Sequence, residues 1–185
     1  MKIRNSLIIT LLASGSVLLA SSALADEPTV VSQQTDRLNI DYVDAEGYTD
    51  IRPSNLGSRS KFRNQVLNTM TEYFDEFAQE LPEGQTLKVT VTDIDLAGDT
   101  RSARIPIGSP LQDVRVMEDI FFPRIKFSYE LQDASGSVLK SEEVSLKDMA
   151  YLDRAGFVRT NRDAFAYERQ MLKEWFERDL MGENS

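Results

Sequence analysis

The stretch Val89–Asp99, VTVTDIDLAGD, decides how the chain folds. Its first residues predict a strand, because valines alternate with threonines and would share one face of a sheet. Strict alternation would then place Asp93 and Asp95 on that apolar face, where burying an unpaired carboxylate costs several kcal/mol. The register of the strand must therefore change near Thr92.

Two structures would resolve this conflict. A β-bulge near Thr92 would turn Ile94 and Leu96 towards the core and leave the aspartates facing away from it. Alternatively, the sheet ends near Thr92 and the aspartates stand at its rim. Both structures keep the carboxylates of Asp93 and Asp95 outside the core.

Two other segments repeat apolar residues at three- and four-residue steps, which is typical of amphipathic helices. The first runs from about Ser58 to Leu81, and Pro82 stops it. The second begins near Thr160 or Asn161. Its apolar face is made by Phe165, Glu168, Leu172, Trp175, Phe176 and Leu180.

Alternating apolar residues predict the remaining strands. Besides the strand from Thr86 to about Asp93, these segments are Leu38–Val43, residues 123–131 and Val138–Leu146, with a shorter extended piece at Asp113–Asp119. A turn at Asp133–Ser137 joins the last two long strands into a hairpin. We therefore expect an α+β fold, with an antiparallel sheet of about four strands and two helices packed on one face.

The first 25 residues have the features of a cleavable export signal. Lys2 and Arg4 form a basic start, an apolar run follows over Ile8–Leu19, and Ala23-Leu-Ala25 is a small-residue cleavage site. Serine and glycine interrupt the apolar run, so an uncleaved membrane span is less well supported. The expected domains are a signal peptide at 1–25, a flexible leader at 26–37 and a single α+β domain at 38–182.

Export would place the mature protein in the periplasm, and secretion beyond the outer membrane stays open. Loss of the two basic residues of the signal changes the net charge from −9 to −11. Nucleic acids and anionic lipid surfaces would repel so acidic a chain. We therefore expect no nucleic-acid partner and no membrane insertion after cleavage. The expected partner is an unknown periplasmic protein or a small ligand.

The chain contains no histidine and no cysteine. Their absence excludes Ser-His-Asp and Cys-His nucleophiles, and also zinc sites that use imidazole or thiolate ligands. Any catalysis would depend on carboxylates, lysine, tyrosine or serine, or on a hard cation held by oxygen atoms. The sequence accordingly identifies no catalytic residue, no metal ligand and no cofactor.

The acidic segment itself admits several interpretations. A helix-loop-helix calcium loop begun at Asp93 fails, because its positions five and twelve would be Ala97 and Arg104. A looser cation site that uses Asp93, Asp95 and Asp99 stays open. An acidic pair two residues apart could also match the roughly 5–9.5 Å separation of glycosidase carboxylates, but almost any such pair would. The simplest role is structural, as a turn, a cap or a salt bridge.

Arg115 and Arg124 are the basic residues best placed to meet these carboxylates. One falls in the short extended piece and the other opens the next strand. They predict either Arg–Asp pairs at the edge of the sheet or a small binding patch made by Asp93, Asp95, Arg115 and Arg124.

The sequence also resembles a known family. The resemblance is carried by TDIDLAGD, FPRIKFSYELQDASGSVLKSEE, LKDMAYL and YERQMLKEWF, and by LNIDYVDAEGYTDIR and LPEGQTLKVTVTD nearer the N-terminus. These segments resemble the pattern of the domain of unknown function 3016 family, a group of exported proteobacterial proteins, over nearly the whole mature chain. The resemblance implies an exported protein of Gram-negative bacteria. It implies no activity and no catalytic residues.

Three hypotheses about function remain. The leading one is a non-enzymatic periplasmic module of the cell envelope that binds a partner protein or a ligand. The second is a carboxylate-dependent hydrolase of an envelope polymer, in which Asp93 or Asp95 works across a cleft with a second acid such as Asp148 or Glu118. The third is a protein that binds a divalent cation.

Overall fold

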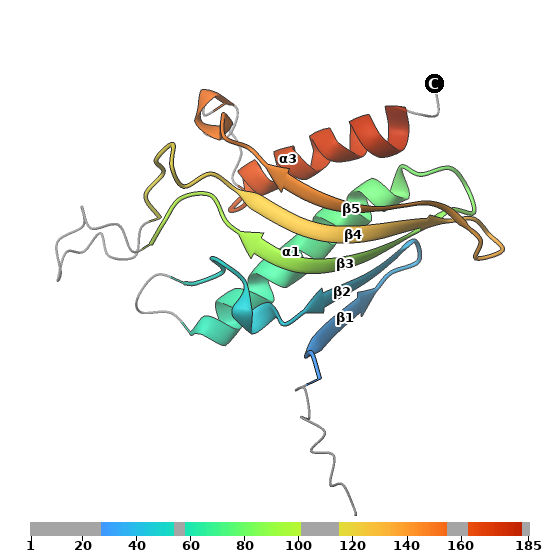
Figure 1. The fold of residues 1–185 in the computed structure, drawn as a ribbon, viewed down its shortest axis with the longest axis horizontal. Coiled ribbons are helices and arrows are strands. Elements are labelled where there is room, and N and C mark those ends of the chain that lie inside the picture. Colours follow the sequence, from blue (N-terminus) through green and yellow to red (C-terminus); the bar gives the residue numbers. More distant parts are fainter. Residues whose placement is uncertain (1–26, 54–57, 101–114, 155–162, 183–185) are drawn as a thin grey trace, which may run out of the picture.

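The computed structural model describes residues 27–53, 58–100, 115–154 and 163–182. A five-stranded sheet, in the order β1-β2-β3-β4-β5, carries two α-helices on one of its faces (Figure 1). The strands are β1 (Val30–Gln34), β2 (Leu38–Val43), β3 (Thr86–Asp95), β4 (Arg124–Gln132) and β5 (Val138–Lys147). The helices are α1 (Arg59–Gln79) and α3 (Ala166–Phe176). Shorter helical turns are η1 (Ala45–Gly47), η2 (Tyr151–Arg154) and η3 (Glu177–Met181).

This architecture confirms the predicted α+β fold, but the sheet has one strand more than expected. β1 lies within residues 26–37, where the sequence predicts a flexible leader, and it pairs antiparallel with β2, Val31 opposite Tyr42. As an edge strand it is exposed along most of its length. It therefore lacks the alternation of apolar and polar residues by which half-buried strands are recognised.

The sheet is also mixed rather than purely antiparallel. β2 and β3 run parallel, with Ile40 opposite Val89, while every other neighbouring pair is antiparallel. The chain crosses from β2 to β3 through α1, which is the kind of long connection that parallel neighbours require. The predicted hairpin between β4 and β5 is confirmed.

The register change predicted near Thr92 is a β-bulge. Val91 lies opposite Phe127 and Asp93 lies opposite Lys126, so Thr92 is the extra residue of the ladder. Beyond the bulge, Ile94 and Leu96 are fully buried. Since β3 continues to Asp95, the alternative in which the sheet ends near Thr92 is wrong.

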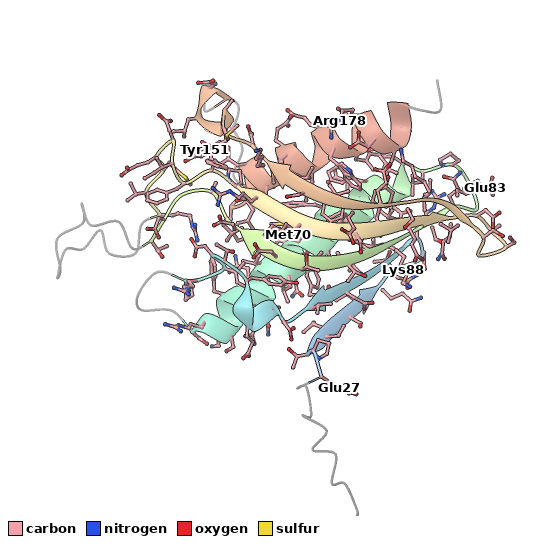
Figure 2. The ribbon with its side chains drawn as sticks, in the orientation of Figure 1. Glu27, Met70, Glu83, Lys88, Tyr151 and Arg178 are labelled. Carbon is pink, nitrogen blue, oxygen red and sulfur yellow. The ribbon has the colours of Figure 1, made fainter. Side chains whose placement is uncertain are left out.

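The core lies between the sheet and the two helices. Trp175 of α3 packs edge-on against Phe74 of α1 and against Phe127 and Tyr129 of β4, with ring centroids 4.8–6.3 Å apart. Met70 of α1, labelled in Figure 2, is buried in the same cluster. The aromatic stripes of both helices thus serve as core, and none of the described helices covers the opposite face of the sheet (Figure 1).

The second helix begins later than expected. Its N-cap is Phe165 rather than Thr160 or Asn161, which lie outside the described residues. Asp163 precedes it, accepting hydrogen bonds from the Phe165 N–H and the Tyr73 hydroxyl. Of the short extended piece predicted at Asp113–Asp119, the described part forms an isolated bridge between Val116 and Asp99. Within the part of the chain that the structure describes, neither helix combines the length and apolar character of a membrane span.

Candidate functional site

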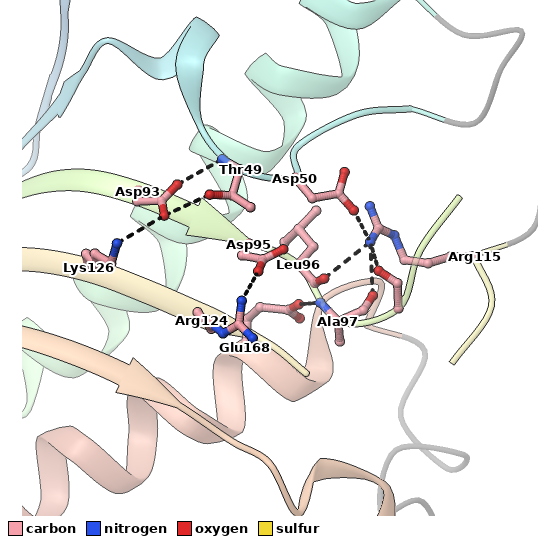
Figure 3. Close-up of polar contacts among 11 residues, drawn as sticks. Thr49, Asp50, Asp93, Asp95, Leu96, Ala97, Arg115, Arg124, Lys126 and Glu168 are labelled. Carbon is pink, nitrogen blue, oxygen red and sulfur yellow. Dashed lines mark hydrogen bonds and ion pairs between the residues drawn. The ribbon is translucent and has the colours of Figure 1, made fainter. Parts of the chain in front are cut away.

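Asp93 and Asp95 face away from the core, on the helix-free side of the sheet, because the bulge has shifted the register (Figure 3). Each lies opposite a basic residue of β4. The Asp93 carboxylate is 3.7 Å from Lys126 Nζ, and the Asp95 carboxylate accepts a hydrogen bond of 3.0 Å from Arg124 Nη1. The two aspartates are therefore members of cross-strand ion pairs.

Asp93 also holds the connection between β2 and α1. Its Oδ1 accepts the backbone N–H of Thr49 over 2.8 Å, and its Oδ2 accepts the Thr49 hydroxyl over 3.0 Å. The next residue, Asp50, forms a short parallel bridge with the end of β3 through the Ile94 carbonyl and the Leu96 N–H. This connection is thereby pinned along the last residues of β3.

Arg115 does not join Asp93 or Asp95. Its Nη1 lies 3.0 Å from Asp50 Oδ2 and points to the carbonyl oxygens of Leu96, Ala97 and Gly98, at 3.3, 3.1 and 2.6 Å (Figure 3). Asp50 is 4% exposed and the Arg115 side chain 17%. Four oxygen atoms thus converge on one guanidinium nitrogen, and their negative charge stabilises the arginine cation.

Glu168 ties α3 to the same segment. Its Oε1 accepts the backbone N–H of Ala97 over 2.7 Å, and the residue is buried. Burial raises the pKa of the Glu168 carboxyl, and the hydrogen bond from Ala97 opposes that effect only in part. A single acidic residue on an otherwise apolar helix face was the sequence signal for this contact.

Position 98 requires glycine. Its φ is +78°, and a Cβ would lie 2.7 Å from Met117 Sδ and 2.8 Å from Arg115 Cγ. The left-handed backbone disfavours other residues, and the close approach of Arg115 would be lost with any side chain there. The glycine of the DLAG sequence is thus explained by packing against Arg115.

We call Asp50, Asp93, Arg115 and Glu168 the β3 clasp, since each fastens another segment of the chain to the end of β3. The four residues of the predicted binding patch therefore do not form one cluster. Asp95 pairs with Arg124, whose guanidinium also stacks over the Phe122 ring, while Arg115 belongs to the β3 clasp. No sequence signal could have matched Arg115 with Asp50, which is 65 positions away.

Asp95 is the half-buried acid of the group. Burial raises the pKa of its carboxyl, and the neighbouring Arg124 guanidinium lowers it by a smaller effect. A raised carboxyl pKa is one property of a general acid, but a hydrolase also needs a cleft and a second acid. Neither the hollow beside the bulge nor the cavities at the start of α1 and between α1 and α3 are lined by Asp93, Asp95, Glu118 or Asp148.

The geometry does not support the predicted cation site, just as it does not support the hydrolase. In the described parts of the chain, no three acidic side chains are grouped so as to hold a metal ion. Asp93 and Asp95 face Lys126 and Arg124, while Asp99 is buried beside its bridge to Val116. The looser site of Asp93, Asp95 and Asp99 is therefore not assembled by this fold.

The helix-free face is hollowed next to the bulge. The depression has a volume of about 370 Å³ and is lined by polar side chains of three strands, chiefly Thr92, Lys126, Ser128, Glu143 and Ser145. It lies beside the Asp93–Lys126 pair. Of the Val89–Asp99 stretch, Thr92 lines this hollow.

Comparison with known proteins places this geometry in a family. The family model described as "Protein of unknown function (DUF3016)" matches residues 36–178. The chain belongs to the DUF3016 family. The DUF3016 match contains the whole β3 clasp and the hollow, whereas β1 precedes it. No curated protein and no solved structure matches the chain.

Proposed function

We propose that this DUF3016 protein is an exported, non-enzymatic binding module of the cell envelope. Its main support is that the carboxylates at the end of β3 are already engaged within the fold. Asp93 bonds Thr49, Asp95 bonds Arg124, and Glu168 bonds the Ala97 N–H. Acids committed in this way stabilise the structure and are poorly disposed to exchange protons with a substrate.

Export is supported by the N-terminal signal features at Lys2 and Arg4, Ile8–Leu19 and Ala23-Leu-Ala25. The periplasm is the compartment in which such a chain would first fold. A chain without cysteine needs no oxidising compartment for its stability, and its core of aromatic and aliphatic side chains is sufficient at this length.

The surface offered to a partner is the helix-free face around the hollow. Lys126 and Glu143 border it with opposite charges, and Ser128 and Ser145 lie between them. Such a polar surface of mixed charge suits the rim of a protein interface. We therefore expect the partner to be a periplasmic protein with a polar surface of mixed charge.

Site-specific photo-crosslinking in the periplasm tests this proposal. A photoreactive residue at Ser145, in the hollow, should give a discrete adduct with one protein. The same residue at Glu72, which is exposed on α1, is the matched control and should give none. Equal adducts from both positions would overturn the choice of surface. Turnover of an envelope polymer that D95N abolishes would overturn the non-enzymatic role.

A further inference from the structure

A cluster of arginines at the start of α1 has no part in the β3 clasp or the helix-free face. Arg52, Arg59 and Arg63 line a cavity of about 450 Å³ between η1 and the first turns of α1. Ser58, Ser60 and Glu46 complete its polar wall. We call it the arginine cavity.

The positive charge of the arginine cavity is only partly compensated. Arg63 Nη1 lies 2.8 Å from the exposed carboxylate of Glu46. Within the described residues, no carboxylate lies within ion-pair distance of Arg52 or Arg59. Grouping like charges without counterions is unfavourable, and it stands out in a chain whose net charge is −9.

The charges also oppose the helix on which two of them lie. The first turn of α1 has no acidic residue, although the helix dipole favours acids there; it carries Arg59 and Lys61 instead, and Arg63 follows at the start of the second turn. The helix dipole repels each basic residue at this end and so destabilises the helix. Selection for stability alone would choose the opposite charges, and local choices that oppose the fold are expected at functional positions.

The floor of the arginine cavity is apolar. Tyr48 and Ile51 line it and are buried. The Tyr48 hydroxyl donates to the Val91 carbonyl over 2.7 Å, so only its ring is offered to the cavity. A ligand that fits would place an anionic group against the arginines and a small apolar group against Tyr48 and Ile51.

We infer that the arginine cavity binds a small phosphate monoester with a compact apolar substituent. Guanidinium groups form paired hydrogen bonds with phosphate oxygens, and the Ser58 and Ser60 hydroxyls, which lie 3.0 Å apart, supply a further donor. The acidic net charge of the chain disfavours an anionic membrane surface as the source of the phosphate. The inference rests on the proposed function only in that the ligand is bound and not converted.

Titration of the ¹⁵N-labelled protein with phenyl phosphate, followed by NMR, tests this inference. We expect saturable shifts at the start of α1 that inorganic phosphate reproduces more weakly. The variant R52A/R59A should bind roughly ten-fold or more weakly, because it removes two of the three guanidinium groups that would donate to the phosphate. The variant R52K/R59K keeps the charge without the fork-like geometry and should bind with intermediate affinity.

K147A/K173A is the matched control, because it removes two exposed basic residues from β5 and α3. It should bind like the wild type. Equal weakening in both double variants, shifts that never saturate, or binding confined to vesicles containing phosphatidylglycerol would overturn the inference. Hydrolysis of phenyl phosphate, seen by ³¹P NMR, would leave the site standing and contradict the non-enzymatic function.

Discussion

The backbone N–H of Ala97 donates to the Glu168 carboxylate over 2.7 Å, across 71 positions of sequence, and so joins the segment after β3 to α3. The same segment meets Arg115 through its carbonyl oxygens. A motif rich in aspartate thus organises the fold through its backbone as much as through its acidic side chains. Its polar groups bond to other residues of the same chain, which is the pattern of a structural element.

Replacing Glu168 separates its hydrogen bond from its charge. Glu168→Gln keeps an oxygen acceptor for the Ala97 N–H and removes a buried ionisable group, so its stability at pH 8 should equal or exceed that of the wild type. Glu168→Ala leaves the Ala97 N–H unpaired and should lose about 1–3 kcal/mol. Urea unfolding at pH 8 measures both changes. A loss in Glu168→Gln as large as that in Glu168→Ala would show that the negative charge itself is required.

The raised pKa of Glu168 also predicts how stability depends on pH. The folded protein keeps a proton that the unfolded chain has already lost, between the unfolded pKa of about 4.3 and the raised folded pKa. Unfolding free energy should therefore fall as pH rises through this window and level off above it. Asp95 acts in the same direction. Glu168→Gln should flatten the profile partly, and an unchanged profile would contradict the assignment.

The bulge at Thr92 predicts opposite outcomes for two deletions in one strand. Deleting Thr92 removes the extra residue, so that Val91 and Asp93 become ordinary neighbours and Ile94 stays buried. Deleting Ile94 instead brings Asp93 into its place in the core, at a cost of several kcal/mol. Circular dichroism and thermal melting should find the first variant folded and the second unfolded. The reverse result, or equal loss in both, would contradict the register.

The fold could be predicted wherever burial alternates or repeats along the sequence. Such patterns located α1, β3 and the hairpin, and the conflict at Thr92 pointed to the bulge. β1 was not predicted, because an exposed edge strand has no buried face and so no alternating pattern of apolar residues. The parallel direction of β2 and β3 was not predicted either, because apolar and polar residues can alternate in the same way in parallel and antiparallel strands.

The site was harder to predict because its contacts are long-range. The Asp95–Arg124 pair follows from neighbouring strands, whereas the partner of Arg115 is Asp50, on the connection before α1. Thr49, Lys126 and the arginine cavity were missed too. Basic residues in the first turn of a helix, where acids are expected, were an available signal for the arginine cavity.

Export makes a prediction about the mature chain. Protein recovered from the periplasm should begin at Asp26, because cleavage is expected after Ala25. Intact-mass spectrometry of the periplasmic fraction measures this directly. Leu12→Arg, which interrupts the apolar run, should leave the full-length precursor in the cell. Full-length chain in the membrane fraction of the wild type would contradict cleavage.

The β3 clasp is tested most directly by a double-mutant cycle on Asp50 and Arg115, measured by urea unfolding. Each single alanine variant leaves a buried partner uncompensated, so both should be strongly destabilised, while the double variant should lose less than their sum by about 1–3 kcal/mol. The pair of Asp95 and Arg124, in which the Arg124 side chain is 44% exposed, is the comparison and should show a smaller coupling of about 0–1 kcal/mol. Additive losses at Asp50 and Arg115 would contradict the β3 clasp.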